Sequence, residues 1–284
     1  MGGTLKSITW GGIKKFPRKL IPMKSRGLLS VLAFSEKREN ILFLLLKEPK
    51  TLSEIKSHLN VTSPEILPRI KEMETKNLIC KDDKHYVLTP IGKVVAKFFQ
   101  PLINTLHVIE ENEEFWEKHM VEAVPQEFLE RICELGSCRL VENRLENMYE
   151  PHTEFFENVS KSELVMGIAP IFNPAYPSFF LQLAQRKVHI ALILTKNVFE
   201  KVKKEYEDTL QRFLDYNNTS LYILNGDIKL AFVVTNEFLS LSLFFRNGTF
   251  DAHRDLISFD KSALKWGDEL FKYYKERSEE IKSL

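Results

Sequence analysis

The chain has 284 residues, of which 44% are hydrophobic and 28% are charged. This is the composition of a globular protein, and the length suffices for two ordinary domains. The longest apolar runs, such as Ile41–Leu46, fall short of the roughly 18 residues that a membrane-spanning helix needs. We therefore expect no membrane-spanning segment.

The three cysteines, Cys80, Cys133 and Cys138, are few and odd in number. Such sparse cysteines are typical of a reducing cytoplasm rather than of a disulfide framework. The separation of Cys133 and Cys138 does not match a zinc knuckle. We interpret them as packing residues in preference to a redox switch, and expect no metal site.

The net charge of +1 hides an uneven distribution along the chain. Residues 1–90 contain 17 Lys and Arg against 9 Asp and Glu, whereas residues 91–284 contain 23 against 30. A basic N-terminal part beside an acidic remainder suggests a polyanion-binding end. Much of the excess lies in residues 1–22, an extension that we expect to be disordered. It is either a basic arm that contacts phosphates or a stretch that precedes the true start at Met23, and we favour the second.

Residues 23–90 combine the signals of three short helices and a hairpin. Ser35 and Thr51 are typical helix caps, and Glu54 completes a capping box with Thr51. Ser63 precedes a third helix with Pro64 in its first turn, whose inner stripe is Ile66, Ile70 and Met73. Two strand-like segments, 78–81 and 85–88, are joined by a tight turn at 82–84. This order is typical of a winged helix-turn-helix DNA-binding domain; the alternative is a small helical domain used only for protein contacts.

The face opposite the inner stripe is expected to contact bases, and the wing to contact the DNA backbone. The candidate DNA-binding residues are Thr62, Ser63, Glu65, Arg69, Glu72, Lys84 and His85.

Residues 91–120 keep helical spacing of their apolar positions, from Val94 and Phe98 to Ile109. We expect a linker helix, kinked or divided at Pro101. Its apolar face serves either a dimer contact or packing within the chain, and two-fold DNA sites favour the dimer.

Residues 121–284 read as a mixed α/β domain. Helical patterns lead up to Ser162, and buried strands at 164–168 and 188–194 flank a helix at 178–185, which suggests parallel strands with helical crossovers. The segment that follows at 196–216 is helical and strongly charged. Three further strands, 221–224, 228–235 and 239–245, come next, with Asn225-Gly226-Asp227 as a hairpin turn. One amphipathic helix is expected over 262–282, with Trp266 and Phe271 on its packing face.

Several segments resemble one family of archaeal regulators. They are Leu243-Phe-Phe-Arg-Asn-Gly-Thr-Phe-Asp251, Leu256-Ile-Ser-Phe-Asp260, the stretch from Ala263 through Trp266 to Tyr274, Gly167-Ile-Ala-Pro170, Ala191-Leu-Ile-Leu-Thr195 and the helix text Leu59–Lys71. The family is common in methanogens, and its effector domain is named for the methanogenesis filament regulator. The resemblance implies a transcription regulator with a C-terminal sensing domain, distantly similar to phospholipase D in fold. It does not imply a particular ligand.

Catalysis by phospholipase D needs a nucleophilic His, a Lys two residues later and an Asp further on, and this pattern is missing. None of the seven histidines is followed by Lys two residues later, and no phosphate-binding glycine loop, nucleophile elbow or zinc-protease motif is present. A shared fold does not require shared chemistry. We therefore expect no enzyme and no cofactor.

Two segments could line an effector pocket. Aromatic residues follow the strand at 164–168 among prolines, and ligands of α/β folds bind at such strand ends. A polar cluster follows the strand at 239–245. The candidates are Pro170, Phe172, Tyr176, Asp251, His253 and Asp255. The alternatives are aromatic packing for the first segment, and helix capping with surface ion pairs for the second.

The function that these patterns favour is a cytoplasmic, homodimeric transcription regulator that binds double-stranded DNA and senses a small molecule. A protein-contact scaffold that uses the winged helix, and a degenerate phosphodiesterase-like enzyme, are the alternatives.

Overall fold

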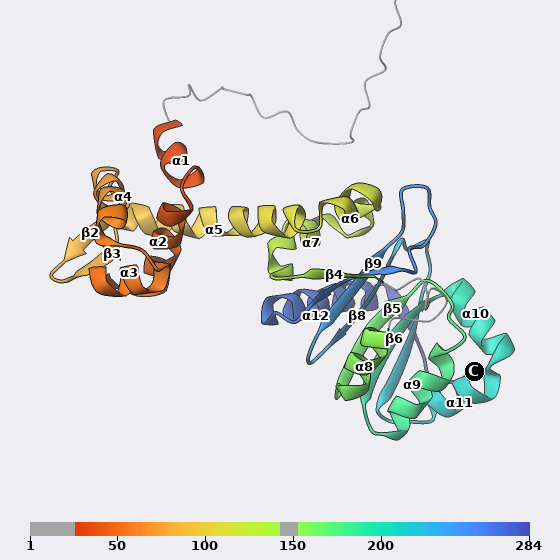
Figure 1. Ribbon diagram of the computed structural model, residues 1–284. Helices are drawn as coiled ribbons and strands as arrows, with labels where there is room; N and C mark the ends of the chain where they lie inside the picture. The colour runs from red at the N-terminus through yellow and green to blue at the C-terminus, as the bar shows by residue number, and fades with distance from the viewer. Residues whose placement is uncertain (1–25, 143–152) are drawn as a thin grey trace, which may run out of the picture. The chain divides into compact units, whose positions relative to one another are not determined.

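The computed structural model of the chain describes residues 26–142 and 153–284 (Figure 1). The chain divides into two compact units, Met1–Phe98 and Phe99–Leu284, and each is described here by itself. The basic extension at 1–22 and the candidate start at Met23 lie outside the described residues.

The first unit contains four helices before the long helix α5, and one small sheet of three strands in the order β1-β3-β2. Its elements are α1 (Arg26–Ala33), α2 (Glu36–Lys47), β1 (Lys50–Thr51), α3 (Leu52–Leu59), α4 (Ser63–Thr75), β2 (Ile79–Asp82), β3 (His85–Leu88) and the start of α5 (Pro90–Glu110). The expected succession of three helices and a hairpin is confirmed as α2, α3, α4 and β2–β3. Helix α1 and the short strand β1, which pairs with β3, are additions that the sequence reading did not contain.

Local signals explain where these helices begin. The backbone N–H of Thr51 donates to the Glu54 carboxylate at 2.7 Å, and Glu54 N–H donates back to the Thr51 hydroxyl at 3.3 Å, so the first capping box forms as expected. A second box starts at Thr62, one residue before the expected cap, with Glu65 as its partner. The inner stripe of α4 is buried as predicted, because Ile66, Ile70 and Met73 all lie in the core.

Helix α5 is one uninterrupted helix of 21 residues that includes Pro101. Of the two expected effects of Pro101, the division of the helix is therefore wrong, since a proline removes one backbone hydrogen bond without requiring a helix to end; the kink stays a prediction. The helix nevertheless stops earlier than the expected linker, at Glu110. Buried Asn112 follows, and the Trp116 indole N–H of the next helix donates to the Val108 carbonyl at 2.9 Å, which fixes a turn at this point.

The second unit holds the remaining elements. These are α6 (Glu113–Lys118), the 3₁₀ turns Val121–Ala123 and Ile132–Leu135, α7 (Gln126–Leu129), β4 (Arg139–Glu142), α8 (Thr153–Lys161), β5 (Leu164–Ala169), α9 (Tyr176–Gln185), β6 (His189–Thr195), α10 (Lys196–Glu205), α11 (Glu207–Leu214), β7 (Thr219–Leu224), β8 (Leu230–Thr235), β9 (Leu239–Leu243), β10 (Arg254–Ser258), α12 (Lys261–Lys275) and β11 (Ser278–Ile281).

One mixed sheet of eight strands forms the centre of this unit, in the order β11-β7-β6-β5-β8-β9-β10-β4. Strands β5, β6 and β7 are parallel, and the other pairings are antiparallel. The mixed α/β class and the parallel pairing of β5 with β6 through the crossover helix α9 are thus confirmed.

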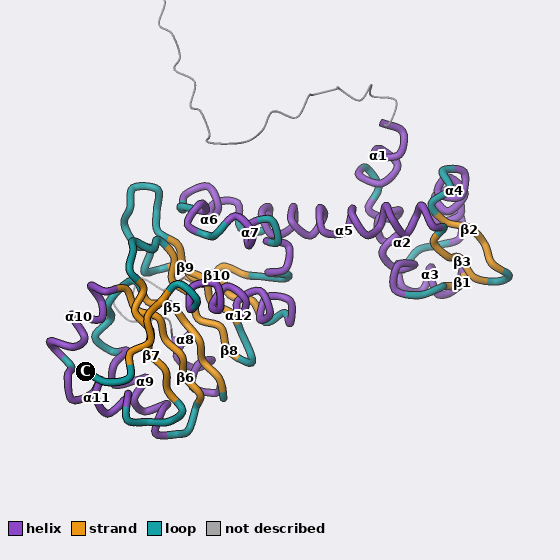
Figure 2. Tube along the Cα trace, turned by 180° about the vertical axis from the view of Figure 1, so that it is seen from behind, coloured by secondary structure: helices purple, strands orange, loops and turns teal. Residues whose placement is uncertain are grey.

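Helices cover both faces of this sheet (Figures 1 and 2). Helix α12 packs on one face with α6 and α7, around the buried Trp266 and Phe271. Helices α8 to α11 pack on the other face, in a separate apolar cluster. The sheet is therefore a central layer between two helical layers.

Two expectations about this unit are wrong. Asn225-Gly226-Asp227 does not close a hairpin, because β7 pairs with β6 and β11 while β8 pairs with β5 and β9. The C-terminal helix ends at Lys275, and Ser278–Ile281 instead adds an antiparallel edge strand to β7. In both cases a local pattern was correct over a short range, and the distant pairing partner decided the rest. The helical character expected for 196–216 is confirmed, in two helices that meet at Tyr206.

Candidate functional site

The two acidic side chains expected on the DNA-facing side of α4 are held within the first unit. Glu65 accepts from the backbone N–H of Thr62 at 2.8 Å and from Lys37 at 2.9 Å. These partners lower the pKa of Glu65 to about 2, the Thr62 N–H first and Lys37 second. Glu72 accepts from the Arg38 guanidinium at 2.5 Å. Cations of α2 therefore offset the negative charges of Glu65 and Glu72.

The exposed residues at the start of α4 and along it agree only in part with the expected set, of which Thr62 and Glu65 are exposed. Ser63, Arg69 and Glu72 are half-buried, and the Arg69 guanidinium donates to the Glu65 carbonyl one turn earlier. The exposed positions of the helix include Pro64, Leu67, Pro68, Lys71 and Thr75. At 100° per residue, positions 64, 68, 71 and 75 lie opposite the buried stripe, so helical spacing alone could have identified Lys71.

The wing is a two-residue turn. Asp82 and His85 face each other across β2 and β3, so that Asp83 and Lys84 form the tip, with Asp83 in the left-handed conformation at φ 52°. The side chains from Lys81 to His85 are all exposed. Lys84 and His85 are thus placed where a DNA backbone could reach them, beside two acidic neighbours.

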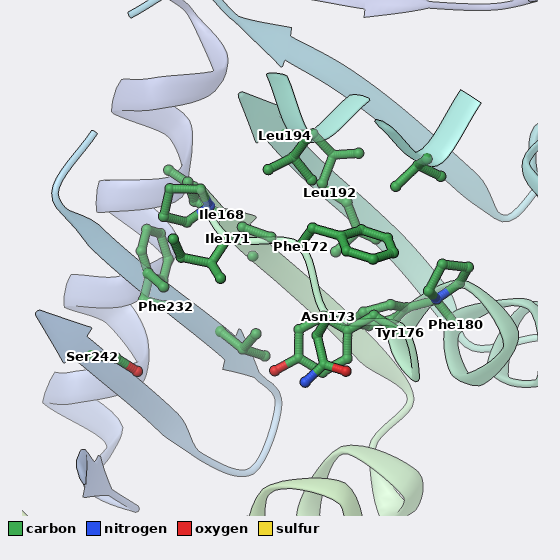
Figure 3. A pocket seen from close by; sticks show the side chains of 18 of the residues that line it. Ile168, Ile171, Phe172, Asn173, Tyr176, Phe180, Leu192, Leu194, Phe232 and Ser242 are labelled. Carbon is green, nitrogen blue, oxygen red and sulfur yellow. The ribbon is translucent and has the colours of Figure 1, made fainter. Parts of the chain in front are cut away.

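A partly open cavity of about 360 Å³ lies in the second unit, on the face of the sheet that carries α9, α10 and α11 (Figure 3). The loop after β5 and the first turn of α9 contribute Pro170, Phe172 and Tyr176. Figure 3 shows Leu192 and Leu194 of β6 on one side and Ser242 of β9 on another. The volume falls in the range of small-molecule pockets, and the wall is mostly apolar, as is usual for them.

The structure brings the two predicted pocket segments to this one cavity. Asp251 and Asp255 line it together with the β5–α9 loop residues, although β6 to β9 separate the two segments in the chain. Asp255 lies on β10, a strand that the sequence reading missed, and both carboxylates are buried. His253 is not among the lining residues; its backbone N–H donates to Asp251 at 2.9 Å.

The polar wall of the cavity comes from β9 and β10. Ser240 and Ser242 of β9 are buried, and the Ser242 hydroxyl donates to the Asp255 carboxylate. Across the cavity, burial raises the pKa of Tyr176 well above its usual range, and the negative charge of Asp255 raises it further. Tyr176 therefore keeps its proton and can serve as a neutral donor.

His119 is a residue of this site that sequence reasoning did not identify. It follows α6, is completely buried, and its Nε2 lies 3.0 Å from the Asp251 carboxylate, while its Nδ1 lies 2.7 Å from the Phe115 carbonyl. The two ring nitrogens thus lie between the Phe115 carbonyl and the Asp251 carboxylate, both of which accept hydrogen bonds. The ring is stacked between Phe115 and Phe245. A histidine whose partner lies 132 residues further along the chain leaves no local sequence signal.

The other chemistry considered from the sequence can be placed in the structure. Cys138 is buried, and burial raises the pKa of its thiol to about 11, which disfavours a reactive thiolate. Within residues 26–142 and 153–284, no group of three or more His, Cys, Asp or Glu could hold a metal ion. In the same ranges, no helix is both long and apolar enough to cross a membrane.

Comparisons with solved structures give distant likenesses. TrmBL2, an archaeal chromatin protein, is 16% identical at a TM-score of 0.41, over 91% of this chain and 100% of that one. The phosphatidylserine synthase of Haemophilus influenzae is 14% identical at a TM-score of 0.37, over 51% of this chain and 40% of that one.

Comparisons of sequence are more specific. The methanogenesis regulatory protein FilR1 of Methanothrix harundinacea is 29% identical over 259 residues, which are 89% of this chain and 58% of that protein. The chain thus spans little more than half the length of this relative. Residues 26–107 match the FilR1 N-terminal domain, and residues 148–277 match the FilR1 middle domain. Over these two ranges the chain is therefore similar to an archaeal regulatory protein.

Proposed function

We propose that the chain is a cytoplasmic transcription regulator, in which the first unit binds double-stranded DNA and the second unit binds a small-molecule effector without transforming it. The observation that carries the proposal is the mostly apolar cavity of about 360 Å³ in a chain that also has a winged helix-turn-helix. The similarity to a methanogenesis regulatory protein supports a regulatory role. We propose the division into a DNA-binding domain at 23–90, a linker at 91–120 and an effector domain at 121–284.

A DNA titration with the full-length protein tests the first half of this proposal. Double-stranded fragments from upstream of its own gene are titrated at several salt concentrations, because a DNA-binding protein releases counterions and loses affinity steeply with salt. Lys84→Ala should lower the slope of log affinity against log salt by about one on any sequence. Lys204→Ala, at an exposed position of α10, is the matched control and should leave the slope unchanged.

The outcomes separate the alternatives. A flat salt dependence, or no DNA binding at all, would favour a protein-contact scaffold. An unchanged slope in Lys84→Ala would remove the wing from the interface. Turnover of a phosphodiester substrate by the purified chain would instead favour the degenerate enzyme, since a sensor binds its ligand and releases it unaltered.

We further propose that a second copy of the chain covers the exposed face of α5. Six large apolar side chains of this helix are between 39% and 74% exposed: Ile91, Val94, Phe98, Leu102, Leu106 and Ile109. Their spacing of three and four residues puts them in one stripe along α5, which is about 31 Å long at 1.5 Å per residue. Such a stripe is the pattern of a two-stranded coiled coil, and a dimer would present two winged helices to a two-fold DNA site.

A further inference from the structure

The charged side chains that line the cavity, among the described residues, are both acidic. Asp251 and Asp255 bear the ionisable groups of the β9–β10 wall, and their side chains are 1% and 9% exposed. An ionised carboxylate accepts hydrogen bonds and donates none. Asp251 already accepts from His119 and from the His253 backbone N–H, and Asp255 accepts from Ser242. Both carboxylates thus have hydrogen-bond donors at the edge of an apolar space.

The cationic side chains nearest to the cavity do not line it. No Lys, Arg or His of the described ranges is among the residues that line the cavity. His119 contacts Asp251 but does not line the cavity. The Arg254 guanidinium lies 4.0 Å from the Asp251 carboxylate and also pairs with Glu142 and Glu114, which do not line the cavity either. Lys201 lies 4.5 Å from the ring centre of Phe172. Burial first, and the Asp255 carboxylate second, raise the pKa of Tyr176, which lines the same cavity.

This arrangement discriminates between ligands by charge. A carboxylate or phosphate in the cavity would lose its hydration and face two like charges at close range. An ammonium or hydroxyl group would donate to the carboxylates and serines of the wall. The apolar remainder of the wall fits a hydrocarbon or aromatic body.

We infer that the cavity takes a ligand with an apolar, aromatic-sized body and a hydrogen-bond-donating end that carries no negative charge, such as a primary amine or an alcohol. The inference rests on the effector role proposed above and specifies its chemistry. The donor end meets the β9–β10 wall at Asp251, Asp255 and Ser242, and the body lies among the side chains of β6 and α9.

Three probes with one carbon skeleton test the inference on the full-length protein. These are 2-phenylethylamine, 2-phenylethanol and phenylacetate, titrated in a calorimeter at constant salt. The amine and the alcohol should bind, and phenylacetate should bind at least about tenfold more weakly, a difference of about 1.4 kcal/mol. Equal or tighter binding of phenylacetate would overturn the inference. Failure of all three to bind would overturn it as well, because each is small enough for the cavity.

A variant identifies the group that discriminates. Asp255→Asn preserves the shape of the side chain and an acceptor for Ser242, so the preference for the amine over phenylacetate should fall about tenfold. Asp215→Asn, exposed at the end of α11 and outside the cavity, is the matched control and should change no affinity. An unchanged preference in Asp255→Asn would show that this carboxylate does not select the ligand. The wild-type series stands without the variant if Asp255→Asn does not fold.

DNA affinity is measured separately in the presence of each probe. If the probes bind in the expected order and operator affinity stays the same, the effector role fails while the ligand class stands. If operator affinity responds to phenylacetate alone, the ligand class fails while the effector role stands.

Discussion

At the scale of single residues, the buried pair of His119 and Asp251 is the most consequential contact of the second unit. Each side chain is almost completely removed from water, so removing one leaves the other without its partner in an apolar surrounding. We predict that Asp251→Ala lowers the free energy of unfolding by about 3–5 kcal/mol. Urea unfolding of the full chain, followed by circular dichroism, measures this loss.

A double-variant cycle separates the pair from its surroundings. His119→Phe with Asp251→Ala removes both partners, and the combined loss should be smaller than the sum of the two single losses by about 0.5–3 kcal/mol. Asp215→Ala, at an exposed position, should change stability by no more than about 0.5 kcal/mol. Simple additivity of the two losses would mean that the 3.0 Å contact contributes nothing specific.

We expect Arg69 and Lys71 of α4 to differ in their roles in DNA recognition. Arg69 must release the Glu65 carbonyl to reach a base edge, where arginine binds guanine in a bidentate manner. We predict that Arg69→Ala costs about 1–3 kcal/mol on a specific site and much less on random DNA. Lys71→Ala, on the outward face, should weaken both alike. Electrophoretic mobility shifts with both DNAs measure this, and equal losses for Arg69→Ala would reduce that residue to a phosphate contact.

At the scale of elements, the stripe on α5 is where oligomeric state can be tested. Phe98 is its most exposed member, at 74%, and we predict that Phe98→Glu converts a dimer into a monomer, because it puts charges into an apolar seam. Sedimentation equilibrium reports the mass. Lys97→Glu introduces the same residue at an exposed position beside the stripe and should leave the dimer intact. A wild-type monomer at high concentration would remove the second copy from the proposal.

At the scale of the whole molecule, effector and DNA should affect each other reciprocally. Contacts lead from the cavity through Asp251 and His119 to α6, and from Trp116 to Val108 of α5. We predict that a bound effector changes operator affinity by about 5–150-fold, and that operator DNA changes effector affinity by the same factor. A ligand at a hundred times its dissociation constant should also add about 2.7 kcal/mol to stability in a thermal shift. Unequal factors in the two titrations would contradict simple linkage.

Much of the first unit could be predicted from its sequence, because its signals are local. The capping box at Thr51, the buried stripe of α4 and the paired strands of the wing each depend on neighbours within a few residues. The same reasoning located the helix and strands from β5 to β6, and it selected the loop after β5 as a ligand-binding segment from its prolines and aromatic side chains. Helical spacing also places Lys71 on the outward face of α4, opposite the buried stripe, although the set of candidate residues does not include it.

Only the tertiary structure decided which strands pair and which distant side chains meet. Asn225-Gly226-Asp227 has the composition of a hairpin turn, yet β7 pairs with β6 and β11. The pairing of buried strands depends on packing across the whole sheet. The same packing made strands of β4, β10 and β11, brought Asp251 and Asp255 to the loop after β5, and buried His119 against Asp251. The sequence by itself determined the kinds of elements and two of the segments that line the cavity. Their meeting depends on contacts between residues far apart in the chain, whose energies no local pattern contains.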